Sequence, residues 1–133
     1  MIIDYKVLNE LTALAKLNPR LRQAYDLRTS VNDNSQRMLN ALELGTVLPV
    51  HRHRNSTETI VCLRGKCVQH IYDDSGIRVE SIYMQPNSDV VGMSVGVGQW
   101  HRLESLESGT IIFQCKDGKY ETLSPADVML IDE

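Results

Sequence analysis

The stretch from Gly45 to Gly65 constrains the fold of this chain more than any other. It reads G-T-V-L-P-V-H-R-H-R-N-S-T-E-T-I-V-C-L-R-G, with two histidines one residue apart and a glutamate soon after. Side chains alternate between the faces of an extended strand, which points His51 and His53 to one side and Arg52 to the other. A bend after the histidines lets Glu58 begin a neighbouring strand, so the two imidazoles and the carboxylate converge.

These residue types are suitable ligands for a divalent transition metal. His101, in G-V-G-Q-W-H, offers a fourth ligand. The sequence therefore predicts one ion of Fe, Mn, Zn, Ni or Co bound by His51, His53, Glu58 and His101. Three histidines and one glutamate leave positions open in an octahedral site, as a catalytic metal requires. The competing interpretation is that H-R-H-R is an exposed loop.

The spacing of these residues resembles the cupin family. Its first motif is a glycine, five residues, H-x-H, three or four residues, a glutamate, six residues and a glycine. The matching residues here are Gly45, His51, His53, Glu58 and Gly65. Gly98 and His101 keep part of the second motif, in which Val90, Gly96 and Ser105 depart from the usual pattern. The resemblance implies an all-β fold: a single cupin (jelly-roll) barrel with a short helical N-terminal extension.

A wider run, from Q-R-M-L-N-A-L-E to H-R-H, and the segments Q-W-H and K-D-G-K-Y resemble the WbuC-type cupins. These are small bacterial proteins associated with surface-polysaccharide gene clusters. The resemblance implies a carbohydrate ligand and an isomerase or epimerase in polysaccharide biosynthesis. Two alternatives stay open: an Fe(II)-dependent dioxygenase of a small molecule, and a non-catalytic metal-dependent ligand-binding module. The sequence identifies no catalytic residue and leaves open whether the chain is an enzyme.

Four further residues are candidates for a substrate pocket: Asn40, Arg37, Lys116 and Tyr120. Arg37 and Asn40 fall on opposite faces of a regular strand, so only one faces the cavity unless a bulge intervenes. An amide suits a sugar hydroxyl, and a guanidinium suits a phosphate or carboxylate. Each candidate also has a plain interpretation, as a surface charge, a strand-edge hydrogen bonder or a solvated strand end.

Two other residues near the motifs have structural interpretations. His70 lies on a predicted strand outside both motifs, which favours a histidine satisfied by hydrogen bonds over a ligand. Trp100 points away from its neighbour His101 in an extended segment, which favours packing on the outer sheet over walling the cavity.

The N-terminal region has a helical pattern. Residues 4–17 place Val7, Leu8, Leu11, Leu14 and Ala15 on one face, and Asp4 is a candidate N-cap. Pro19 ends this helix, and Asn18-Pro19 predicts a second short helix to about Tyr25. We expect these helices to cover an open end of the barrel; a lid or a dimer arm is the alternative.

From Leu27 onward the pattern predicts short strands separated by turns, which is typical of a sandwich or barrel. The predicted strands are 37–44, 59–64, 66–72, 77–84, 101–103 and 110–116, with one short strand within the glycine-rich residues 90–97. The expected division is an extension over residues 1–28 and a barrel over 29–133, within one domain by length. Three cysteines in apolar strand contexts are expected to be buried free thiols.

The charge pattern excludes several classes of partner. The net charge is −3 with acidic and basic residues interspersed, which predicts no nucleic-acid binding. No apolar run approaches the length of a membrane span, and the first residues lack the pattern of a signal peptide. The expected location is cytoplasmic, with a small-molecule ligand, no membrane association, and a homodimer left open.

Overall fold

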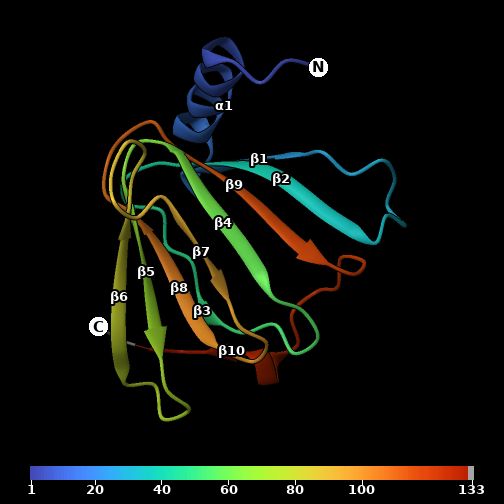
Figure 1. Cartoon of the computed structure of the whole chain (residues 1–133), viewed down its shortest axis with the longest axis vertical. Helices are drawn as coiled ribbons and strands as arrows, with labels where there is room; N and C mark the ends of the chain where they lie inside the picture. Colours follow the sequence, from blue (N-terminus) through green and yellow to red (C-terminus); the bar gives the residue numbers. More distant parts are fainter. Residues whose placement is uncertain (132–133) are drawn as a thin grey trace.

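The structure, a computed structural model, describes residues 1–131 (Figure 1). Within that range, ten strands form two five-stranded antiparallel sheets. Sheet A has the order β1-β2-β9-β4-β7, with bounds Arg22–Asp26, Ser35–Leu42, Thr110–Asp117, Glu58–Arg64 and Gly92–Val95. Sheet B has the order β10-β3-β8-β5-β6, with bounds Val128–Met129, Val50–His51, Trp100–Ser105, Cys67–Tyr72 and Arg78–Met84. This is the predicted all-β jelly roll with a helix at its N-terminus.

The two sheets pack face to face over a shared apolar core. Alternation along each strand sends every second side chain inward, where the sheets interdigitate. The core residues from sheet A are Leu42, Ile60, Cys62 and Ile112, and those from sheet B are Cys67, Met84 and Leu103. Cys62, Cys67 and Cys115 are free thiols, as the sequence predicted; the first two are buried, whereas Cys115 is only partly buried.

The inner faces change from apolar to polar toward one end of the sandwich. Along β9 (Thr110–Asp117) the inward series is Ile112, Gln114 and Lys116. Along β4 (Glu58–Arg64) it runs from Cys62 through Ile60 to Glu58, which pairs with Lys116 in register. Because the strands are antiparallel and in register, their polar ends meet, and this end of the sandwich holds a cavity between the sheets.

The glycine that closes the first motif has a steric reason to be there. Gly65 has φ +83°, a conformation that L side chains rarely adopt. A Cβ at this position would lie 2.7 Å from the Cα of Thr110 on β9. Gly65 therefore permits the chain to cross from β4 in sheet A to β5 in sheet B in a single tight turn.

Helix α1 (Tyr5–Leu17) begins where the sequence predicted, with the Asp4 side chain accepting a hydrogen bond from the Val7 amide at 3.1 Å. Its position differs from the expectation. Leu8, Leu11 and Ala15 pack on the outward-facing residues of sheet A: Leu39, Ala41 and Ile111. The helix thus covers the outer face of sheet A (Figure 1) and not an open end of the barrel.

The predicted second helix, to about Tyr25, is wrong. The chain leaves α1 at Asn18 in an extended conformation, and Leu21 then has a positive φ of 57°. Residues 22–26 form β1, which pairs with β2 along its whole length. Strand pairing across sheet A outweighs the weak local helical signal, and a segment expected to be an extension contributes a strand to the sandwich.

After β9 the chain runs along the open end of the sandwich. We call residues 118–127 the C-terminal strap; it ends in the 3-10 turn Pro125–Asp127 and leads into β10 (Figure 1). Its start is held by the Gly118 amide, which donates to the Asn34 carbonyl at 2.7 Å. Its end is held by Asp127, which accepts from the guanidinium groups of Arg52 and Arg54. The tail from Tyr120 has no clear sequence periodicity, so the sequence does not predict β10.

In residues 1–131, no helix combines the length and apolar character needed to cross a membrane.

Candidate metal centre

Three histidine rings meet at the polar end of the sandwich, at the boundary between the sheets. His51 ends β3 (Val50–His51), His101 lies directly opposite it on β8, and His53 follows in the loop after β3. The ring centroids of His51 and His101 are 4.2 Å apart. The ring centroid of His53 lies 5.0 Å from that of His51 and 5.4 Å from that of His101. One nitrogen of each ring lies within 4.8 Å of the other two, a spacing that can hold a single ion.

Backbone carbonyls fix the orientation of two of these rings. Nδ1 of His51 lies 2.9 Å from the carbonyl oxygen of Pro49, and Nδ1 of His101 lies 2.8 Å from that of Gln99. A carbonyl only accepts, so each Nδ1 carries the proton and each Nε2 presents a lone pair. Nε2 of His53 and His101 are buried and have no hydrogen-bond partner. Buried ring nitrogens without partners that lie this close together fit a metal ion well.

A turn locks His53 beside His101. The backbone amide of Gly98 donates to the carbonyl of His53 at 2.8 Å. Gly98 has φ +74°, which favours glycine, and it is three residues before His101. The glycine retained from the second motif therefore joins the two halves of the site.

The carboxylate of Glu58 lies beside these rings on the opposite sheet. Its oxygens lie 3.3 Å from Nε2 of His53 and 3.7 Å from Nε2 of His101. Lys116 places its Nζ 3.7 Å from the same carboxylate. Burial alone would raise the pKa of Glu58, but the neighbouring rings of His101 and His53 and the charge of Lys116 outweigh it, so the pKa lies below its usual range. Glu58 is thus an anion suited to offset a cation's charge.

His51 is held as a neutral ring. Burial, followed by the neighbouring His101, lowers its pKa from 6.5 to about 4. A neutral imidazole is the form that binds metal. A donor set of three imidazoles and one carboxylate fits a divalent transition metal.

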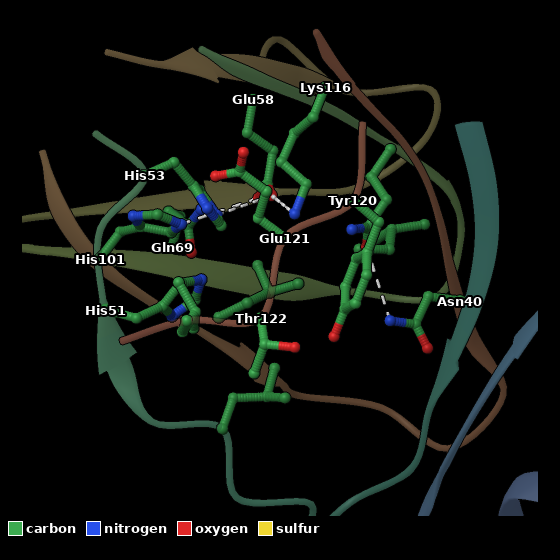
Figure 2. Close-up of a pocket in the computed structure, with 15 residues that line it drawn as sticks. Asn40, His51, His53, Glu58, Gln69, His101, Lys116, Tyr120, Glu121 and Thr122 are labelled. Atoms are coloured by element: carbon green, nitrogen blue, oxygen red, sulfur yellow. Dashed lines mark hydrogen bonds and ion pairs between the residues drawn. The ribbon is translucent and has the colours of Figure 1, made fainter. Parts of the chain in front are cut away.

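The centre lies in a cavity of about 350 Å³ between the sheets (Figure 2). Asn40 on β2, Lys116 on β9 and Tyr120 on the C-terminal strap all line it. Arg37 does not. Its guanidinium points to the other face of β2, where it donates to the carbonyl of Leu27 and pairs with Asp33 at 2.9 Å. Strand alternation explains the difference, since Arg37 and Asn40 are separated by an odd number of residues.

The sequence did not single out several other residues in the cavity wall. They are Gln69 on β5, Gln114 on β9, and Glu121, Thr122 and Leu123 on the strap. Gln69 is in phase with Cys67 and Ile71 along β5, so alternation from the core cysteine could have placed it inward. The strap residues carry no such signal, because they follow no strand period.

His70 and Trp100 have structural environments on the outer face of sheet B. Nδ1 of His70 lies 2.8 Å from Ser81 Oγ and its Nε2 lies 2.9 Å from a Glu104 oxygen, so both nitrogens are paired. Trp100 packs with Val50 and Tyr72 and stacks under the Arg52 guanidinium, 4.4 Å from its ring centroid. Neither residue contributes to the cavity.

Solved structures of other proteins share the fold of this chain. KdgF from Halomonas sp. superposes with a TM-score of 0.61 at 12% identity over 78% of this chain and 85% of that one. The capsular polysaccharide assembling protein CapF from Staphylococcus aureus gives 0.66 at 16% identity over 87% of this chain. A recombinant oxalate oxidase in complex with glycolate gives 0.61 at 15% identity over 76% of this chain. The chain spans only 33% of CapF and 53% of the oxalate oxidase.

The likeness to these structures shows a shared fold, and within it the cluster of three histidines forms a candidate metal centre. A family model matches residues 3–84, and the chain belongs to that family, described as a domain of unknown function (DUF6016). No curated protein matches the sequence.

Proposed function

We propose that this protein binds one divalent transition metal through His51, His53, His101 and Glu58 and acts on a sugar or sugar derivative as an isomerase or epimerase. The observation that carries the proposal is the convergence of three imidazoles and one carboxylate at the wall of a polar cavity. A site with four protein ligands leaves coordination positions free on the cavity side.

A divalent ion bound there would supply Lewis acidity toward oxygens of a bound ligand. The chain's own groups would do the rest. Glu58 offsets the positive charge of the ion, and the carbonyls behind His51 and His101 keep both rings in the metal-binding tautomer. Lys116, Tyr120 and Glu121 bring an amine, a phenol and a carboxylate to the cavity, any of which can exchange a proton with a sugar.

The carbohydrate assignment rests on similarity to other proteins and on the lining of the cavity. The sequence resembles the WbuC-type cupins of surface-polysaccharide gene clusters, and CapF, which shares the fold, is a capsular polysaccharide assembling protein. The cavity itself is lined by amides, a hydroxyl-bearing threonine and a phenol, which suit a polyhydroxylated ligand. Together these observations favour a role in polysaccharide biosynthesis.

The test begins with metal content. Purified protein, native and after reconstitution, is expected to hold about one divalent ion per chain. Glu58→Gln keeps the shape of the side chain and removes its charge, so it should lower metal affinity while the protein stays folded. Glu104→Gln is the matched control, because it removes the same charge on the outer face of sheet B. Absence of metal from both native and reconstituted protein would sink the proposal.

The second stage addresses the reaction. Metal-loaded protein is incubated with sugar phosphates and nucleotide sugars, and epimerisation or isomerisation is followed by NMR in deuterated water. Incorporation of deuterium at a sugar carbon, lost in Glu58→Gln, supports the proposal. Uptake of oxygen with substrate would indicate a dioxygenase instead, and tight binding without turnover would indicate a non-catalytic binding module.

A further inference from the structure

The cavity beside the candidate metal centre contains two buried amide oxygens without partners, Oδ1 of Asn40 and Oε1 of Gln69. Asn40 comes from sheet A and Gln69 from sheet B, and both line the cavity (Figure 2). A buried acceptor left without a donor is costly, and such atoms are rare in folded proteins. Two of them facing one cavity indicate that a ligand supplies the missing hydrogen bonds.

The chemistry of the two amides indicates which functional group of a ligand would pair with them. Among residues 1–131, the one acceptor that Asn40 Nδ2 reaches is Oε1 of Gln114, and at 3.5 Å that contact is long. Turning either amide would exchange its oxygen for a donor at the same place, and that donor would need a partner as well. A hydroxyl both donates and accepts, so ligand hydroxyls satisfy Asn40 and Gln69 in either orientation.

The charged groups in the cavity indicate the sign of the ligand's charge. Lys116 is half-buried beside the proposed metal ligands, and its Nζ lies 3.7 Å from the carboxylate of Glu58. A divalent ion brings two positive charges, Glu58 removes one, and Lys116 adds one. Glu121, on the exposed strap, offsets only part of that excess. A cavity with excess positive charge and apolar walls behind it favours an anionic ligand.

We propose, on the basis of the proposed function, that Lys116, Asn40 and Gln69 form a recognition subsite for a polyhydroxy carboxylate, a sugar acid of monosaccharide size. The carboxylate lies toward Lys116 and the metal side, and the hydroxyls reach the amides of Asn40 and Gln69. The volume of about 350 Å³ is near the lower end of the roughly 300–1,000 Å³ seen for small-molecule sites. A single sugar ring or chain fits that volume, and a nucleotide sugar does not fit whole.

Three probes separate the contributions of charge and hydroxyls. Metal-loaded protein is titrated by calorimetry with D-gluconate, with sorbitol, which lacks the carboxylate, and with hexanoate, which lacks the hydroxyls. Gluconate is expected to bind at least about tenfold more tightly than either analogue, because only it engages both the cation and the amides. Metal per chain is measured after each titration, so that removal of the ion by gluconate is not mistaken for binding.

Variants test separately the residue proposed to bind the carboxylate and a residue proposed to bind the hydroxyls. Lys116→Met keeps the length of the side chain and is expected to abolish the preference for gluconate over sorbitol. Gln69→Met keeps the volume and is expected to weaken gluconate and sorbitol while leaving hexanoate unchanged. Lys119→Met is the matched control for charge, since Lys119 lies outside the cavity wall.

The outcomes distinguish this inference from the proposed function. A chain that takes up no metal overturns the proposed function and the subsite with it. One metal per chain with no preference for gluconate, or a preference that survives in Lys116→Met, overturns the subsite and leaves the metal centre standing. Absence of binding by all three probes to metal-loaded protein also overturns the subsite.

Discussion

At the scale of single residues, His51 makes the protein sensitive to pH. Its pKa is lowered from 6.5 to about 4 by burial and by His101. A group with a depressed pKa binds fewer protons in the folded state, so its contribution to stability is present above about pH 6.5 and is lost as pH falls toward 4. The shift corresponds to roughly 3 kcal/mol of unfolding free energy for the metal-free protein.

The measurement is urea unfolding of metal-free protein at pH 7, 5.5 and 4.5. Glu58 also has a lowered pKa, but in the unfolded chain it takes up a proton only near its ordinary value of 4.5, so the window between pH 7 and 5.5 reports on histidine. His51→Gln is the control, because it removes the titrating group and should flatten the dependence. If the unfolding free energy changes equally with pH in the two proteins within that window, His51 is not the source of the pH dependence.

The residues of the candidate metal centre were predictable because their signal is local. His51, His53 and Glu58 are fixed by alternation and by the spacing across one bend, which the sequence displays directly. Gln69 was missed for the opposite reason. Whether a strand residue faces a cavity or a packed core depends on which residues lie across from it, and those that share the cavity wall with Gln69, such as Asn40 and Gln114, are distant from it in the chain.

At the scale of secondary-structure elements, the helix shows where sequence prediction is strong and where it fails. The apolar stripe and the Asp4 cap predicted α1 almost to the residue. The pattern does not say which surface the stripe covers, so the expectation of an open barrel end was wrong. Residues 22–26 failed in another way, because strand pairing with β2 is a long-range interaction that a short window cannot register.

Packing of α1 on sheet A should contribute to stability without affecting the metal centre. Leu11 is 4% exposed and packs among the outward residues of sheet A, so Leu11→Ala should cost about 2–5 kcal/mol. Leu14, on the same helix, is 51% exposed, and Leu14→Ala should change the unfolding free energy by no more than about 0.5 kcal/mol. Urea unfolding measures both, and metal per chain should be unchanged in each.

The C-terminal strap should owe its position largely to Asp127. This carboxylate accepts hydrogen bonds from Arg52, Arg54 and Ser124, and Arg52 is itself packed against Trp100. Asp127→Asn weakens these charge-assisted contacts, so the strap should detach more often and trypsin should cleave after Lys119 several-fold faster. Asp89→Asn, an equal charge change on a distant exposed loop, is the control. Unchanged cleavage in Asp127→Asn would show that the strap is held by its other contacts.

At the scale of the whole molecule, the core and the metal centre occupy different parts of the sandwich. The shared core between the sheets, from Leu42 to Leu103, contains none of the candidate ligands, and the cluster beneath α1 lies on the far face of sheet A. The charged side chains of the inner faces, Glu58 and Lys116, lie at the end that holds the centre. The fold therefore has apolar packing that does not depend on an ion, unlike a small domain built around structural zinc.

Metal should accordingly raise the melting temperature of a protein that is already folded. An ion that binds the folded state alone, at a free concentration about 100 times its dissociation constant, adds about 2.7 kcal/mol, or roughly 10 °C for a domain of this size. Chelation should reverse the gain and leave the circular dichroism of the sheets unchanged at room temperature. The His53→Gln variant lacks one proposed ligand and should melt at nearly the same temperature with and without metal. The His70→Gln variant should keep the full rise in melting temperature, because His70 lies on the outer face of sheet B. If chelation unfolds the native protein at room temperature, the ion is a structural element of the sandwich and the separation between core and centre fails.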